Sequence, residues 1–127
     1  MNWNRKTDDV PVSTSVVLLD SFDIQQGARK LHINIGNTGA AALNSFRIDV
    51  LPQDKAYWFP VASDDSSFTS DMEYPLELMQ TITSPSITSL ASDDMAWIDM
   101  DILGMTKARL YASSVSDTTV NIRWQTR

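Results

Sequence analysis

Strict alternation of apolar and polar residues along four segments constrains this chain more than any other feature of its sequence. A strand is the regular structure in which alternate side chains share one face, so each segment predicts a strand. The segments are residues 31–35, 46–50, 97–102 and 120–124. Each should bury one face and expose the other, as in antiparallel sheets that are packed on one side. The residues expected in the core are Ile33, Ile35, Ile48, Val50, Ile98, Met100, Ile102, Leu110, Val120 and Ile122.

Shorter apolar runs and turn residues extend this pattern over most of the chain. Residues 16–20 and 109–112 predict two further strands, and residues 76–83 fit either a strand or a short helix opened by Pro75. Residues 36–39 and 113–117 are rich in Gly, Asn and Ser, which favour turns between strands. Seven to eight short strands without an amphipathic helix predict an all-β fold. We expect an antiparallel β-sandwich of the jelly-roll or Ig-like type.

Two polar segments stand apart from the alternating pattern. A chain of 127 residues is the size of one domain. Residues 1–15 are polar and carry Pro11 and a single Trp3, so they predict a flexible N-terminal arm, with the sandwich domain at residues 16–127. Residues 62–72 are rich in Ser and Asp and predict a long exposed loop.

Composition narrows the classes of partner. The chain has no Cys, which excludes disulfides and thiolate chemistry. Its net charge of −6 and its scattered basic residues argue against direct contact with nucleic acid. No apolar stretch reaches the roughly 20 residues of a membrane span, and the first residues lack the apolar run of a signal peptide. We therefore expect a protein made in a cytoplasm, with no membrane contact.

No residue constellation predicts a catalytic or metal site. There is no Gly-rich phosphate loop, no Gly-x-Ser-x-Gly and no His-Glu-x-x-His. His32 is the single His, whereas a triad or a zinc site needs a base orienter or further ligands. We expect His32 to be a surface or cross-strand side chain. The sequence thus predicts a protein that is not an enzyme, with no catalytic residue, cofactor or metal ligand.

Four Asp residues near position 100 leave other chemistries open. Asp99 and Asp101 should share one strand face about 7 Å apart. With Asp93 and Asp94 they are able to hold Ca²⁺, and the spacing also suits a pair of glycosidase carboxylates. A solvated acidic face is the interpretation we prefer.

Aromatic and charged residues supply the candidates for partner binding. Within the triplet Tyr57-Trp58-Phe59 one side chain should enter the core and its neighbour should face outward, where aromatics anchor protein interfaces or sugar rings. Trp97 is expected to pack against an adjacent strand or the arm. The acidic loop suits a basic partner surface. The partner-binding candidates are Trp3, Arg5, Lys6, Tyr57, Trp58, Asp64 and Asp65.

The C-terminal part of the chain carries a resemblance to a known group of proteins. A Ser/Asp turn precedes an acidic alternating strand and a Gly in residues 90–104, followed by an Arg-Leu strand at 108–112 and a Thr-Val strand at 118–124. This pattern, over residues 80–127, resembles small β-sandwich structural proteins of tailed bacteriophage particles.

The resemblance implies a role in the virion without catalytic residues. It points to a capsid decoration (cement) protein, with a tail or fibre component as the alternative. Expected partners are the major capsid protein, other virion proteins and further copies of the chain, with a trimer favoured. Two other classes stay open. A carbohydrate-binding module would stack a sugar on Tyr57, Trp58 or Trp97, and a host-directed or regulatory protein would bind through its acidic surface.

Overall fold

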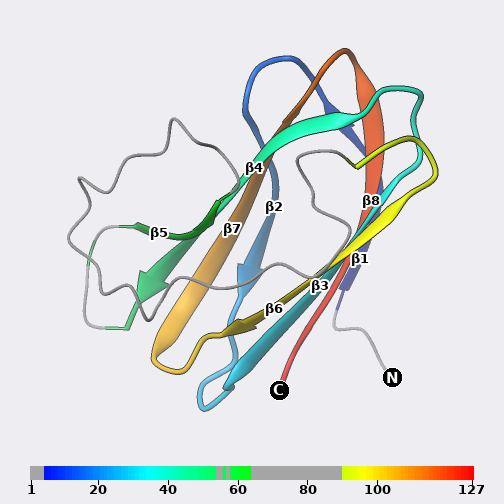
Figure 1. Cartoon of the computed structure of the whole chain (residues 1–127). Coiled ribbons are helices and arrows are strands. Elements are labelled where there is room, and N and C mark those ends of the chain that lie inside the picture. The colour runs from blue at the N-terminus through cyan, green and yellow to red at the C-terminus, as the bar shows by residue number, and fades with distance from the viewer. Residues whose placement is uncertain (1–4, 54–55, 57, 64–89) are drawn as a thin grey trace.

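The computed structural model describes residues 5–53, 56, 58–63 and 90–127, and these form eight strands and no helix (Figure 1). In chain order the strands are β1 (Arg5–Val12), β2 (Val17–Asp23), β3 (Lys30–Asn37), β4 (Leu43–Pro52), β5 (Phe59–Ser63), β6 (Met95–Asp101), β7 (Met105–Ser114) and β8 (Thr118–Thr126). Every segment predicted as a strand within the described residues is a strand. Residues 64–83, which include most of the predicted acidic loop and the ambiguous segment at 76–83, lie outside the described part.

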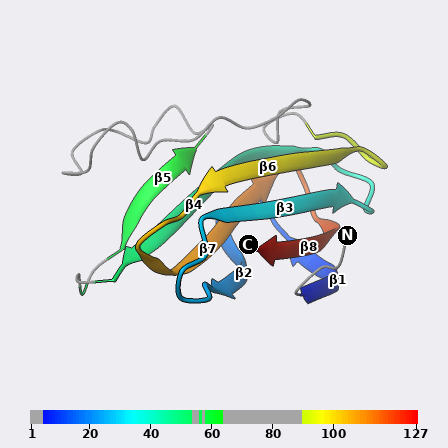
Figure 2. The ribbon, with the colours of Figure 1, turned by 90° about the horizontal axis from the view of Figure 1, so that it is seen from below.

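The strands form two antiparallel four-stranded sheets, ordered β1-β8-β3-β6 and β2-β7-β4-β5. The sheets lie face to face as two layers (Figure 2). Among the strands of the described residues, only β4 and β5 follow one another in the chain and also pair with each other. The other successive strands alternate between the two layers. This order is that of a jelly roll and differs from the Ig-like arrangement, whose sheets pair strands ABED and CFG. The predicted all-β sandwich is confirmed as its jelly-roll form.

The core lies between the two sheets and contains all ten residues that the alternation predicted. Phe22, Phe46, Leu31 and Leu43 are buried with them, and the rings of Phe22 and Trp124 pack with centroids 5.0 Å apart. Complete burial of one such side chain stabilises the fold by about 1.5–3 kcal/mol. The two sheets are therefore held together mainly by apolar packing.

The predicted flexible arm over residues 1–15 is wrong for residues 5–12. These residues form β1, which pairs with β8 from Arg5 opposite Trp124 to Val12 opposite Thr118. The ladder has a bulge between Thr7 and Val10, where Asp9 has a φ of 56°. The bulge, the charges and Pro11 are features of an edge strand, which has one side without a partner in its sheet. The sandwich thus begins at β1 and not at residue 16.

Asn37 and Gly39 act differently from the hairpin turn that the sequence suggested. Asn37 ends β3, and its side chain is 1% exposed. Its amide donates to the carbonyls of Ala41 (2.7 Å) and Leu90 (3.0 Å), and its oxygen accepts from Thr118 Oγ1 (3.0 Å). A Cβ on Gly39 would lie 2.6 Å from the backbone nitrogen of Thr119, so close packing requires this glycine. The segment joins the two sheets and is not a hairpin.

Among the described residues, none belongs to a helix long and apolar enough to cross a membrane. Residues 62 and 63 belong to β5, so the exposed loop predicted over residues 62–72 is wrong for these two residues.

Candidate binding surfaces

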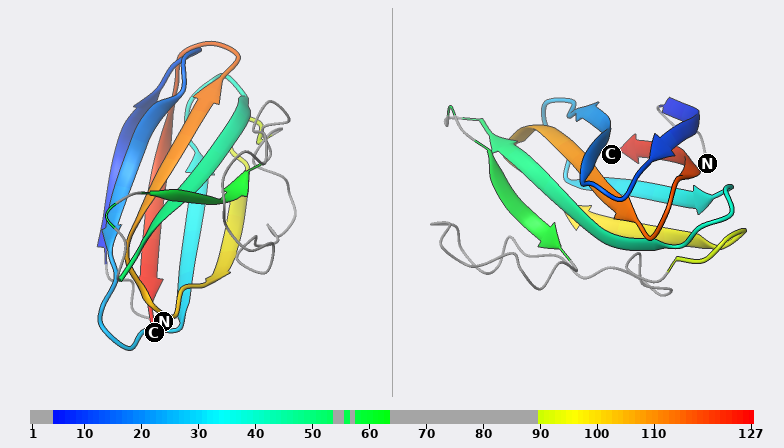
Figure 3. Two further views of the ribbon diagram at one scale, coloured as in Figure 1. Left: turned by 90° about the vertical axis from the view of Figure 1, so that its left-hand side faces the viewer. Right: turned by 90° about the horizontal axis from the view of Figure 1, so that it is seen from above.

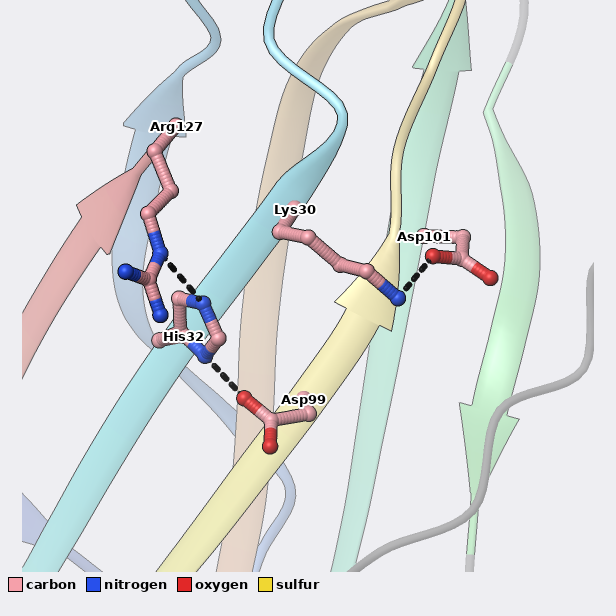
Figure 4. Close-up of polar contacts among 5 residues, drawn as sticks. All are labelled: Lys30, His32, Asp99, Asp101 and Arg127. Atoms are coloured by element: carbon pink, nitrogen blue, oxygen red, sulfur yellow. Dashed lines mark hydrogen bonds and ion pairs between the residues drawn. The ribbon is translucent and has the colours of Figure 1, made fainter.

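A row of cross-strand polar pairs lies on the outer face of sheet β1-β8-β3-β6, between β3 and β6 (Figure 4). Lys30 pairs with Asp101, and His32 Nδ1 contacts Asp99 Oδ1. The two pairs are in register in the antiparallel ladder. Arg127 Nε donates to His32 Nε2 at 3.1 Å, so Nδ1 is left to donate to Asp99. The prediction that His32 is a cross-strand side chain is confirmed.

These pairs also decide the interpretation of the acidic residues at the end of β6. Asp99 and Asp101 each face a basic side chain of β3. Within residues 5–53 and 90–127, as in the rest of the described chain, no group of three His, Asp or Glu side chains is placed to hold a metal ion. The side chains of Asp99 and Asp101 are 57% and 65% exposed, so the face is solvated as predicted, and the basic side chains of β3 make it a face of paired charges.

Farther along the same face, a shallow depression surrounds Gly36. We call it the Gly36 hollow. It has a volume of about 200 Å³ and is lined by Asn34, Gly36, Asn37, Thr38, Asp93, Asp94, Met95, Asn121 and Arg123. Trp97 lies directly opposite Asn34 in the β3–β6 register and is 45% exposed. Trp97 thus faces outward on its strand, beside the hollow.

The outer face of sheet β2-β7-β4-β5 carries two arginines over aromatic rings. The guanidinium of Arg47 lies 4.4 Å from the ring centroid of Tyr111, and that of Arg109 lies 3.9 Å from the centroid of Trp58. Arg47 Nε is also 3.0 Å from Asp49 Oδ1. Burial raises the pKa of the Asp49 carboxyl, although the charges of Arg47 and Arg109 oppose this shift. Trp58 is half-buried beneath an arginine.

An apolar groove opens at one end of the sandwich, where β1 ends and β2 begins. These two edge strands lie along the same side of the molecule (Figure 3), and Thr7 Oγ1 donates to Asp20 Oδ2 between them at 3.2 Å. The groove has a volume of about 690 Å³. It is lined by Val10, Pro11, Val12, Ser13, Val17, Leu18, Gly39, Ala40, Asp117, Thr118 and Thr119. Val16, Leu18 and Val115 at the same end are about half exposed or more.

The structure separates the partner-binding residues that the sequence suggested. Lys6 is exposed on β1, 3.9 Å from Asp8 and opposite Arg123 of β8, whereas Trp58 lies against the other sheet. Arg5 begins β1. Trp3, Tyr57, Asp64 and Asp65 lie outside the described residues. The sequence did not reveal the groove or the hollow, because each is built from three or more segments that are distant in the chain.

Strand order, core and surfaces together define a jelly-roll β-sandwich protein. One solved structure that it matches is the crystal structure of the SPBc2 prophage-derived protein YomS, with 16% sequence identity and a TM-score of 0.50. The correspondence covers 95% of this chain and 92% of that one, so the two proteins share the fold along nearly their whole lengths. No protein-family model matches the sequence, and no curated protein matches it.

Proposed function

We propose that this chain is a non-enzymatic structural protein of a bacteriophage particle, made in the host cytoplasm and built into the virion. The observation that carries the proposal is the jelly-roll fold, which it shares with a prophage-derived protein over 95% of its length. Jelly rolls are a recurrent architecture of viral capsid domains. Because a fold alone does not define a function, the surfaces and the particle itself provide the test.

The apolar groove is the surface through which the protein contacts its partners. Leu18 lines the groove and is about half exposed, as are Val16 and Val115 at the same end of the sandwich. Apolar side chains exposed together are typical of protein interfaces. The edges of β1 and β2 both contain bulges, and β1 also carries Pro11. Bulges and proline hinder the addition of a further strand, so side-chain packing at the groove is the favoured mode of contact.

Within this role, capsid decoration is the preferred position, and the preferred state is a homo-oligomer, with a trimer favoured. Several copies packed through the groove would cover the half-exposed valines and leucine. The tail or a fibre is the alternative position. Light scattering on the purified chain measures the mass directly, and a monomer at high concentration would contradict self-association.

Detection of the protein in particles tests the function. Particles released by cells that carry the gene are banded by density, heads are separated from tails, and an antibody against the chain is applied to each fraction. We expect the protein in the head fraction. Presence in the tail fraction alone would favour the alternative position, and absence from both fractions would contradict a virion role.

A pair of substitutions tests the surface independently of the location. Leu18→Asp or Val115→Asp places a charge among these exposed apolar side chains, and either variant should fail to bind particles that lack the protein. Leu103→Asp is the matched control, because Leu103 is 63% exposed in the turn between β6 and β7, away from the groove. Binding of the first two variants at the level of the control would show that the groove is not the contact surface.

A further inference from the structure

Gly36 lies at the bottom of the Gly36 hollow, and neither its backbone conformation nor its neighbours require a glycine at this position. Gly36 lies within β3 and is not among the described residues with positive φ. A Cβ at this position would meet only Met95 Cγ, at an ordinary distance of 3.7 Å. Glycine within a strand costs roughly 0.5–1 kcal/mol relative to alanine, and it often marks a close approach by a ligand. The effect of this glycine is to keep the hollow open.

The residues that line the hollow offer both hydrogen-bond donors and acceptors, and two of them are oriented by hydrogen bonds within the protein. Asn34 is 3% exposed, and its Nδ2 donates to the carbonyl of Ala96 at 3.3 Å. Asn121 Oδ1 accepts from the backbone nitrogen of Asp9 at 3.0 Å, which orients the Asn121 amide and leaves its NH₂ group as a donor. Arg123 adds donors, and Asp94 adds acceptors. Such a mixed set matches a ligand with several hydroxyl groups, each of which donates and accepts.

The charges around the hollow argue for a neutral ligand. Asp93 and Asp94 line one side of the hollow and Arg123 lines another, so the hollow presents both signs of charge. A phosphate would meet two carboxylates, and a metal cation would meet a guanidinium. At about 200 Å³ the hollow is smaller than the roughly 300–1,000 Å³ of sites for drug-sized molecules, so it suits one small ring.

Trp97 supplies an apolar plate beside these polar groups. It lies two residues from Met95 on the same strand face, and both side chains are nearly half exposed. An indole ring presents a large flat surface of the kind that packs against the C–H face of a sugar ring. We propose that the Gly36 hollow and Trp97 together bind one hexopyranose unit of a neutral glycan. This site is on the sheet face, apart from the apolar groove, and does not depend on a role in the virion.

Glycan binding by the purified full chain tests the proposal. The labelled protein is applied to a glycan array that contains neutral, sialylated and sulfated glycans, and the best neutral binder is then titrated by NMR. We expect binding to at least one neutral glycan, with shifts of the amides of residues 34–36, 95–97 and 121–123. Absence of binding to every neutral glycan would overturn the inference, as would binding confined to sialylated or sulfated ones.

Three variants locate the site. Trp97→Ala removes the plate and Gly36→Val fills the hollow, and each should weaken glycan binding at least tenfold. Leu103→Ala is the control, since it removes an exposed apolar side chain from the turn after β6 and should change the affinity less than twofold. Thermal unfolding of each variant confirms that it is folded, and Gly36→Val serves alone if Trp97→Ala is not. Unchanged affinity in the folded variants at these two positions would overturn the proposal.

Discussion

The outer faces of the two sheets differ in how far their ion pairs are exposed to solvent. On sheet β1-β8-β3-β6 the side chains of Lys30 and Asp101 are 51% and 65% exposed. On sheet β2-β7-β4-β5 those of Arg47 and Asp49 are 32% and 13% exposed, and Arg47 also lies over Tyr111. Exposed pairs contribute about 0–1 kcal/mol, whereas the removal of one member of a buried pair is costly. The exposed pair of Lys30 and Asp101 is therefore expected to contribute less to stability than the more buried pair of Arg47 and Asp49.

The largest effects should come from the core that both faces share. Ile122→Ala in β8 and Ile48→Ala in β4 each remove a side chain with 0% exposure, one from each sheet. Each should lower the free energy of unfolding by about 2–5 kcal/mol, measured by chemical denaturation. A clear loss for one variant and none for the other would mean that the two sheets do not share a single cooperative core.

Next in size is the removal of an arginine from the more buried face. Arg109→Ala loses the contact with the Trp58 ring and the packing of the side-chain stem, and we expect a loss of about 1–2 kcal/mol. Arg127→Ala on the opposite face is the matched variant and should cost less than about 0.5 kcal/mol. Equal losses would remove the distinction between the faces. A double-mutant cycle with Trp58→Ala isolates the stacking contribution.

A smaller and pH-dependent effect is expected at Asp49. Because its pKa in the folded protein is raised above the usual value of 3.8, ionisation of Asp49 is less favourable in the folded than in the unfolded state. Its contribution to stability is therefore greatest below pH 3.8 and decreases as the pH rises through the folded-state pKa. Asp49→Asn removes this dependence.

The measurement is the difference in unfolding free energy between Asp49→Asn and the wild type across the acid range. This difference should move in favour of the variant as the pH rises from about 3 to about 7. Movement in the opposite direction would show that attraction to Arg47 and Arg109 outweighs burial.

The smallest effect should be found at the exposed pair of Lys30 and Asp101. A double-mutant cycle with alanine at both positions should give a coupling energy of about 0–0.5 kcal/mol, and added salt should reduce it further. A coupling energy above about 1 kcal/mol would exceed the range of exposed pairs and would remove the contrast with the pair of Arg47 and Asp49.

The alternation of apolar and polar residues predicted correctly which face of each strand is buried, because the burial of apolar side chains decides which face turns inward. Ile98, Met100 and Ile102 face inward, while Trp97 and Asp99 between them face outward, as a strand with one packed side requires. The strand β1 was missed for a physical reason. Its sequence, RKTDDVPV, lies at a sheet edge and needs few apolar residues, so it does not differ from a polar tail until its partner β8 is known.

The surfaces were less predictable than the core, because they depend on which strands are neighbours. Gly36 opens a hollow only because Met95 of β6 and Asn121 of β8 lie on either side of it. The apolar groove likewise depends on the jelly-roll order, which brings the ends of β1, β2 and β8 together. His32 was predictable, since its strand position required an outward direction and the facing β6 supplied an acid.

The position of β8 between β1 and β3 has a consequence for the way the chain is made. Asp9 and its partner Asn121 are 112 residues apart, and a ribosome adding 5–20 residues per second needs roughly 6 to 22 s to span that interval. Throughout this time β1 exists as nascent chain without the strand that it joins. An apolar strand is prone to aggregate while it has no partner, whereas charged residues and proline, here Lys6, Asp8, Asp9 and Pro11, disfavour pairing with another chain. The polar character that makes β1 resemble a tail in the sequence is thus also the character that a strand needs if it is made long before its partner.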